Sequence, residues 1–388
     1  MNPRLSLLAT TASILGLALL SGCTDNTAVA TSDGQLTVNA TDTECRVSST
    51  TAPSGTVTFT VTNAGSKVTE FYLLGSDGLR IVAEVENIGP GLSRDLVFSA
   101  APGEYFTACK PGMVGDGIRA AFTVSDSGAD LTPTGDAAAL VAAADSAYGS
   151  YVRDQTEQLV TKTEEFASLV KAGRDDDARV LYAEARVHWE RIETVAESFG
   201  DLDPRMDARE ADLEPGDEFT GWHRLEKDLW PARAVDYTPM TASERAEIAD
   251  LLVADTHTLY DRTRDMTFDA SQIANGAKGL LDEVATGKVT GEEEYWSRTD
   301  LWDFQANVDG ARVAWEGLEP LLLVKDPELN SMIGSEFEHL QGLLDAQRVG
   351  ASGFVTYDKL TPAQVKELAD AVNSLSEPLS KLAGAVLG

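Results

Sequence analysis

A histidine and a glutamate lie three residues apart in the stretch GWHRLEKDLW, which begins at Gly221 and ends just before Pro231. On a helix, residues three apart lie on one face, so His223 and Glu226 can present an imidazole nitrogen and a carboxylate to one point. The chain has only four histidines. The spacing predicts part of a metal site, although a solvated helix face in an acidic protein shows the same spacing.

A second group of acidic residues precedes this pair. Glu190 and Glu193 share a helix face in HWERIE, and Asp207 follows in a loop crowded with acids. Helical bundles form carboxylate metal sites by turning Glu and His inward from facing helices, where buried anions need a cation. Without that cation the acids would repel one another, so replacing Glu190 and Glu193 by Gln should stabilise the metal-free form.

The mixture of ligands indicates which metals suit such a site. Carboxylate oxygens with one imidazole nitrogen favour iron first, then manganese, zinc or calcium. The chain after residue 109 contains no cysteine, which argues against a structural zinc cluster in this half. Gly-rich phosphate-binding loops are absent as well, and we expect no organic cofactor.

Helical periodicity in residues 137–388 predicts an all-α bundle that positions these residues. Residues 137–172 and 175–199 are expected to form an antiparallel pair of helices, separated by Gly173. Capping patterns predict later helix starts at Thr241, Asp326 and Thr361.

In the N-terminal part of the chain the hydrophobic pattern repeats every two residues instead. Apolar and threonine residues alternate in GTVTFTVT, which begins at Gly55, and turn signals recur up to residue 125. Residues 35–125 are therefore expected to form a small β-sandwich. The turn-rich residues 126–136 are expected to link this domain to the helical one.

The first 23 residues have the composition of an export signal. An apolar run follows Arg4 and ends in Leu20-Ser-Gly-Cys23, which predicts a lipoprotein signal peptide over residues 1–23 and a lipidated Cys23. Residues 24–34 then form a tether. The protein is expected to be extracytoplasmic and anchored to the membrane of the cell envelope, or periplasm, by this lipid, in a compartment where disulfides persist.

The net charge of −32 limits the class of partner. It repels phosphate backbones and anionic lipid surfaces, so we expect no nucleic-acid partner and no membrane contact beyond the lipid anchor. An acidic surface also raises the local concentration of cations, but solubility or salt adaptation explains it equally well.

Three blocks of sequence carry a resemblance to a known family. GWHRLE matches the GxHxxE motif of the imelysin-like family, and WERIETVAESFGDLDPRMDARE (from Trp189) and TDLWDFQANVDGA (from Thr299) lie around it in the same order. The chain resembles the EfeO type of iron-uptake lipoprotein. The resemblance implies a cupredoxin-like β-sandwich followed by an imelysin-like helical bundle.

The resemblance also implies a function and a site. The cargo is iron, as Fe2+ or Fe3+, passed to an Efe-type membrane permease that works with a haem-peroxidase-like partner. His223 and Glu226 belong to the site through the motif, whereas Glu190, Glu193 and Asp207 are implied by their matching blocks. A further acid among residues 292–294, with Glu293 at the centre, is the weakest candidate.

Cys45 and Cys109 remain as a pair once Cys23 is assigned to the lipid. The front domain has no histidine, so its ligands cannot form a type 1 copper site. We expect a disulfide in an oxidising compartment. The family resemblance leaves open a second metal site for iron, copper or zinc, with candidate ligands Cys45, Cys109, Met113, Glu44 and Glu70.

Two other functions remain open from sequence. The imelysin family carries a peptidase label, but the HExxH motif of thermolysin-like metallopeptidases is absent. A surface lipoprotein with a β-sandwich also fits carbohydrate binding or adhesion. We expect a binding protein rather than an enzyme.

Overall fold

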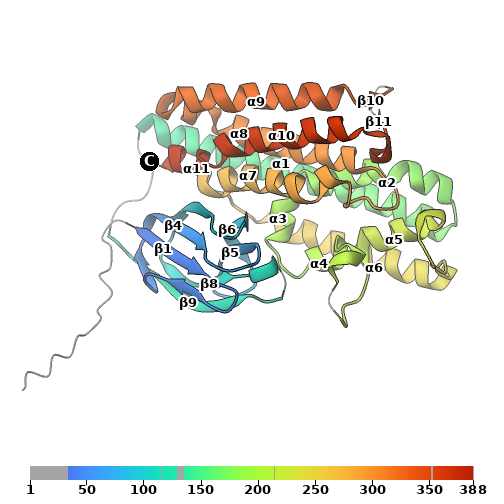
Figure 1. Cartoon of the computed structure of the whole chain (residues 1–388), viewed down its shortest axis with the longest axis horizontal. Coiled ribbons are helices and arrows are strands. Elements are labelled where there is room, and N and C mark those ends of the chain that lie inside the picture. Colours follow the sequence, from blue (N-terminus) through green and yellow to red (C-terminus); the bar gives the residue numbers. More distant parts are fainter. Residues whose placement is uncertain (1–33, 114, 129–134, 214, 351–352, 388) are drawn as a thin grey trace, which may run out of the picture.

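A computed structural model describes residues 34–113, 115–128, 135–213, 215–350 and 353–387. The β-strands of the front half and the helices of the second half form two adjoining parts, as expected from the change of period (Figure 1). The predicted signal peptide, Cys23 and all of the tether but Gly34 lie outside the described residues. Among the described residues, no helix combines the length and apolarity that crossing a bilayer requires.

The front part is a β-sandwich of two sheets. The first sheet has the order β2-β1-β4-β7 and the second the order β3-β9-β8-β5-β6. The strands are β1 (Gln35–Ala40), β2 (Cys45–Val47), β3 (Thr51–Pro53), β4 (Gly55–Asn63), β5 (Thr69–Leu74), β6 (Ile81–Ile88), β7 (Ser93–Ala100), β8 (Gly103–Cys109) and β9 (Ile118–Ser125).

The alternating strand β4 supplies the centre of the sandwich core. Val57, Phe59 and Val61 are completely buried. The Phe59 ring lies 5.0 Å from that of Phe71 and 5.9 Å from that of Phe98, so aromatic contacts join the two sheets. The period-two pattern thus placed the apolar side chains on the correct face.

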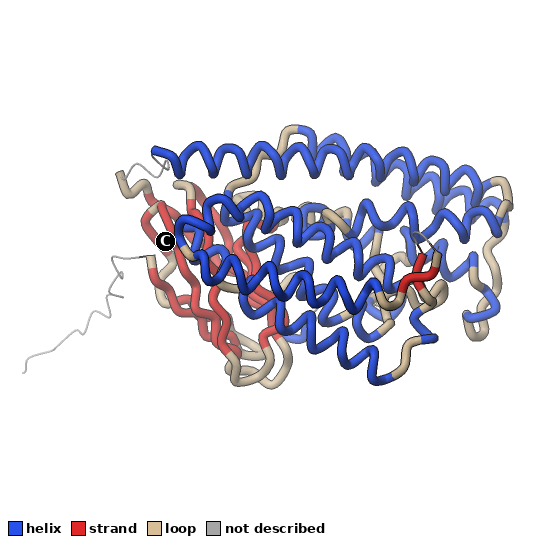
Figure 2. Tube along the Cα trace, turned by 90° about the horizontal axis from the view of Figure 1, so that it is seen from above, coloured by secondary structure: helices blue, strands red, loops and turns tan. Residues whose placement is uncertain are grey.

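The second part consists of helices packed around two apolar cores. One core lies among the later helices and the other among α1, α2, α5 and α6. The helices are α1 (Gly135–Lys171), α2 (Asp175–Glu190), α3 (Glu193–Glu197), α4 (Asp203–Met206), α5 (Gly221–Leu229), α6 (Ala242–Arg264), α7 (Ala270–Thr286), α8 (Asp300–Lys325), α9 (Pro327–Asp345), α10 (Pro362–Leu379) and α11 (Leu382–Leu387). Figure 2 shows the long helices running along the molecule, with the strands of the β-sandwich at one end.

The single helix predicted over residues 175–199 is wrong, because the structure has two helices there. Helix α2 ends at Glu190 and α3 begins at Glu193. Asn307 of α8 donates a hydrogen bond to the Glu190 carbonyl at 2.7 Å. An ideal Cβ on Gly310 would lie 2.4 Å from the Arg191 carbonyl oxygen. The close packing of α8 against this backbone therefore accompanies the interruption, which no local pattern in the sequence encodes.

The predicted helix starts are confirmed. Thr241 and Thr361 form capping boxes, and the Asp326 side chain accepts the Leu329 N–H at 2.9 Å. The helical half also contains a short hairpin that sequence reasoning missed, formed by β10 (Arg348–Val349) and β11 (Gly353–Phe354).

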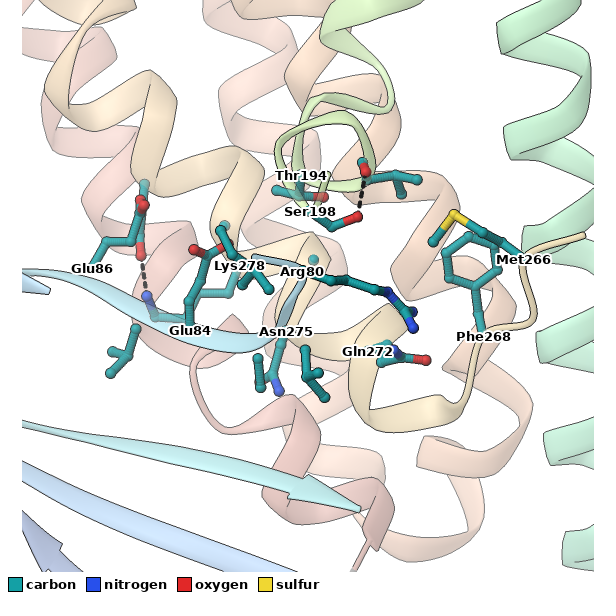
Figure 3. A pocket seen from close by; sticks show the side chains of 18 of the residues that line it. Arg80, Glu84, Glu86, Thr194, Ser198, Met266, Phe268, Gln272, Asn275 and Lys278 are labelled. Carbon is teal, nitrogen blue, oxygen red and sulfur yellow. Dashed lines mark hydrogen bonds and ion pairs between the residues drawn. The ribbon is translucent and has the colours of Figure 1, made fainter. Parts of the chain in front are cut away.

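Strand β6 packs against α7 where the two parts meet. Figure 3 shows Glu84 and Glu86 of β6 near Asn275 and Lys278 of α7, around a cavity of about 80 Å³. Direct hydrogen bonds cross this domain interface: the Asn275 side chain donates to the Val97 carbonyl at 2.9 Å, and the Ile81 N–H donates to the Ser198 carbonyl at 3.1 Å.

Candidate metal centre

The acids and the histidine singled out in the helical half come together between its two apolar cores. They are carried by the end of α2, by α3, by the residue after α4, by α5 and by the loop of residues 291–299 before α8. All of them are buried: Glu190, Glu193, Asp207, His223, Glu226 and Glu293.

A glycine at the start of α5 permits this assembly. Gly221 has φ of 75°, a left-handed conformation that glycine adopts without strain. An ideal Cβ there would lie 2.1 Å from the Met206 carbonyl oxygen. The chain before α5 therefore passes directly over the end of α4, which brings His223 beside Asp207. The first position of the GxHxxE motif thus has a steric explanation.

His223 stands in the middle of the carboxylates and is itself completely buried. Its Nδ1 lies 3.3 Å from Glu226 Oε2. Its Nε2 lies 3.6 Å from an Asp207 oxygen and 3.5 Å from a Glu293 oxygen, yet it makes no hydrogen bond. When Nδ1 donates its proton to Glu226, Nε2 presents a lone pair toward two anions. A cation placed between these three groups would bind all of them.

The loop of residues 291–299 is tied to α5 through Glu226. Its Oε1 accepts hydrogen bonds from the backbone N–H groups of Trp296 at 2.7 Å and Ser297 at 2.6 Å. This leaves Oε2 toward His223. Glu226 therefore orients the ring and at the same time fixes the loop that carries Glu293.

Arg186 of α2 lies inside the cluster and is completely buried. Its guanidinium pairs with Glu190 and Asp207 and approaches Glu294 at 2.7 Å and Asp303 at 3.4 Å. The planar fork of an arginine suits several carboxylates at once. Arg186 thus neutralises part of the negative charge that the folded chain concentrates here.

Lys288 is a second buried cation in contact with the acids. Its Nζ lies 3.1 Å from Glu190 Oε2 and 3.0 Å from both carboxylate oxygens of Glu193. Lys288 therefore offsets part of the repulsion expected between Glu190 and Glu193 in the metal-free form, although Glu190 still raises the pKa of Glu193.

The charges of this cluster shift the pKa values of its members. Burial and the nearby Arg186 both favour a neutral His223. The carboxylates of Glu226, Glu293 and Asp207 outweigh them and raise the pKa of His223 to about 10. In the metal-free protein the ring is therefore an imidazolium, and an incoming metal ion would have to displace its Nε2 proton to bind the lone pair there.

Burial, reinforced by neighbouring carboxylates, raises the pKa of Glu193, Glu294 and Asp303 above the ordinary range. Burial acts in the same direction on Glu293, but Lys288 and His223 outweigh it and lower the pKa of that carboxyl. Because burial raises the pKa of several of these acids, entry of a cation is linked to release of protons.

A pocket of about 530 Å³ leads from the protein surface to this cluster. His223 and Glu293 lie in its wall, together with Glu292, Tyr295 and Trp296. Arg209 also lines the pocket, with its Nη1 3.7 Å from Glu293 Oε2. Small ions therefore have a route to the Asp207, His223 and Glu293 side of the cluster.

Three sets of ligand atoms within 4.8 Å of one another occur in this cluster: Asp207, His223 and Glu293; His223, Glu226 and Glu294; and Glu190, Glu193, Asp207 and Glu293. Sequence reasoning missed Arg186, Lys288 and Asp303, whereas Glu294 lies within the range of residues 292–294 that it offered as the weakest candidate. The spacing of Arg186 four residues before Glu190 was a signal for an ion pair on one helix face, and Asp303 lies in the TDLWDF block. No feature of the sequence around Lys288 indicated that it would lie in this cluster.

In the described part of the front domain, the candidate ligands do not assemble the alternative metal site. Cys45 and Cys109 form a disulfide, with Cα atoms 5.5 Å apart, which joins the two sheets. The expected disulfide is thus present, and the sulfur atoms are not free thiolates. Glu44 is exposed and paired with Arg46. Glu70 accepts a hydrogen bond from the hydroxyl of Tyr72, and Met113 is 37% exposed.

The fold and the cluster define a class: a two-domain protein with a β-sandwich and a helical bundle that holds a buried carboxylate–histidine centre. Residues 144–382 match the imelysin family, and residues 11–124 match the cupredoxin-like domain. "Iron uptake system component EfeO" of Escherichia coli O157:H7 is 38% identical over 357 residues, which cover 91% of this chain and 92% of that protein. Proteins of this name from Escherichia coli K12 and Shigella flexneri match equally well. The chain belongs to this EfeO family, with its imelysin and cupredoxin-like domains.

Proposed function

We propose that this protein is an iron-binding component of an iron uptake system, and that the buried carboxylate–histidine cluster is the site that holds the iron. The observation that carries the proposal is the unpartnered Nε2 of His223, which faces the carboxylates of Asp207 and Glu293 at 3.6 and 3.5 Å. Oxygen ligands with one imidazole are a donor set that suits iron. The family relatives named for iron uptake support the choice of cargo.

Binding and release both need an open approach to the ion. The pocket beside Glu293 supplies one, and from it the ion would pass to a membrane permease that works with a haem-peroxidase-like partner. Lipidation of Cys23 would hold the protein close to that permease outside the cytoplasm. The Cys45–Cys109 disulfide supports an oxidising compartment.

Calorimetric titration of residues 24–388 with ferrous iron under argon, and with chelated ferric iron, tests the proposal. We expect binding with a dissociation constant at or below the micromolar range, and a loss of at least about tenfold in His223→Ala and in Glu226→Ala. His257→Ala is the matched control, because His257 is exposed. Within the described residues, its ring forms an ion pair with Glu164 and with no acid of the cluster. Equal affinities in all variants would refute the site.

Two further assays distinguish the proposal from peptidase activity and from glycan binding. Hydrolysis of peptides by metal-loaded protein, lost in Glu226→Ala, would replace the proposal with an enzymatic function. Retention on glycans without any metal dependence would replace it with carbohydrate binding.

A further inference from the structure

Lys288 is a positive charge buried inside a site that is to receive another positive charge. Only 1% of its surface is exposed, and its Nζ lies 3.0 to 3.1 Å from oxygens of Glu190 and Glu193. Both acids belong to a group of four whose ligand atoms approach within 4.8 Å, completed by Asp207 and Glu293. The ammonium thus lies beside two of the four acids of this group.

The four acids of that group form two pairs, and each pair faces a different nitrogen-bearing side chain. On the side of Glu190 and Glu193 the carboxylates are already paired with Lys288. On the other side, Asp207, which also pairs with Arg186, and Glu293 face the unpartnered Nε2 of His223 at the wall of the pocket. An ion arriving through the pocket therefore meets the second side first.

We propose that Lys288 is a tethered internal cation that sets the affinity and the charge preference of the site. It occupies the inner position between Glu190 and Glu193 and leaves the outer position, at Asp207, His223 and Glu293, for one cargo ion. This inference rests on the proposed function, because it takes the cluster to be the cation site. Lys288 is a positioning and tuning residue and does not itself touch the cargo ion.

The physical basis is Coulomb repulsion at short range. A fixed positive charge next to the ion lowers affinity by an energy proportional to the charge of the ion, and a poorly hydrated interior screens it weakly. Such a charge also keeps Glu190 and Glu193 together when the cargo ion is absent. A site tuned in this way binds an ion without holding it irreversibly, which suits a protein that must release its cargo.

Lys288 can be tested more cleanly than Arg186. Arg186 contacts several acids on different elements, so its loss would disturb the fold. Lys288 pairs with only Glu190 and Glu193 among the described residues. It lies in a short 3-10 segment, Lys288–Thr290, where the chain enters the loop before α8.

The experiment is a titration of wild type and Lys288→Met with Mn2+ and Tb3+, which serve as divalent and trivalent probes without redox chemistry. We expect affinity for Mn2+ to rise about tenfold or more in the variant. Because the repulsion scales with ionic charge, a tenfold gain for Mn2+ corresponds to a gain of about thirtyfold for Tb3+. Lys288→Arg, which keeps the charge, should bind both ions within about threefold of wild type.

Two controls separate charge from packing. Lys278→Met removes a lysine that is paired with Asp282 at the domain interface, and its affinities should equal those of wild type. If Lys288→Met does not fold, Lys288→Gln replaces it, because the amide can still donate hydrogen bonds to a carboxylate without carrying charge. A structural role alone predicts unchanged or weaker binding in the uncharged variants, and that result would overturn the inference.

Ion binding by the wild-type protein separates failure of the proposed function from failure of the inference about Lys288. If wild-type protein binds none of iron, Mn2+ and Tb3+, the proposed function itself fails. If wild type binds these ions and the uncharged variants bind no more tightly, only the inference about Lys288 fails.

Discussion

The backbone of Gly221 lies so close to that of Met206 that an ideal Cβ on the glycine would fall 2.1 Å from the Met206 carbonyl oxygen. This approach, with φ of 75° at Gly221, is what brings helix α5 and its histidine against the residue that follows α4. The geometry of the candidate metal centre therefore depends on a glycine that provides no ligand.

Replacing Gly221 by Ala should destabilise the protein and weaken metal binding together. The left-handed conformation alone costs a non-glycine residue about 1–2 kcal/mol, and the backbone must move to relieve the clash. We expect a loss of about 2–4 kcal/mol in the free energy of unfolding, measured with urea. Gly342→Ala, at an exposed helical position with open space around it, should instead stabilise by about 1 kcal/mol. Equal stability of the Gly221→Ala protein would contradict this account.

Replacing Glu190 and Glu193 together by Gln should destabilise the metal-free protein, the reverse of what the sequence suggested. Lys288 would lose both of its carboxylate partners, and an unpaired buried charge costs about 3–5 kcal/mol. Thermal unfolding of the metal-free double variant measures this. Glu184→Gln, on the exposed face of the same helix, is the control. A double variant more stable than wild type would show that Lys288 does not neutralise these acids.

Stability should depend on pH through the domain interface. Burial, with the carboxylates of Glu70 and Glu283 nearby, raises the pKa of Glu84 from 4.5 to about 8, although Lys110 and Lys278 act against the shift. An acid whose pKa is higher in the folded state binds its proton more tightly there. This favours folding at low pH, and the contribution is lost as pH rises from about 4.5 to about 8.

The variant Glu84→Gln isolates that contribution. It should raise the melting temperature at pH 8 relative to wild type and change it little at pH 4.5. Asp95→Asn, at an exposed position of β7, controls for the loss of one negative charge. A difference between Glu84→Gln and wild type that is the same at both pH values would exclude Glu84 as the group responsible.

Loss of the Cys45–Cys109 disulfide should destabilise the β-sandwich. The two cysteines are 64 residues apart in sequence, and closing a loop of this length stabilises by about 4 kcal/mol on the chain-entropy model. Urea unfolding of the Cys45→Ala/Cys109→Ala double variant measures the loss. Thiol counting on denatured, non-reduced protein of residues 24–388 should find no free thiol, whereas two free thiols would refute the bond.

The sequence predicted those parts of the fold that repeat a local pattern. The alternation around Phe59 and the caps at Thr241 and Thr361 each depend on residues a few positions apart. The interruption after Glu190 does not, because it coincides with a contact from Asn307, which lies 117 residues further along the chain. Contacts of this kind leave no local trace in the sequence.

The same distinction applies to the site. His223 and Glu226 were visible because their spacing of three places both on one helix face. Lys288 was not visible, because a lysine between two glycines in TGKVTG has the composition of an ordinary turn. Only the fold brings its ammonium group to Glu190 and Glu193. Lys288 and Glu193 are 95 residues apart in the sequence. Ligands can be read from motifs, but the charges that balance them depend on tertiary structure.

The most direct test of the central claim is a crystal structure of the iron-loaded protein with anomalous data collected at the iron absorption edge. The account predicts one strong peak on the pocket side of the cluster, within bonding distance of His223 Nε2 and of oxygens from Asp207 and Glu293, and no such peak in His223→Ala. An iron peak only in the β-sandwich or at the domain interface, with His223 still unbound, would contradict it.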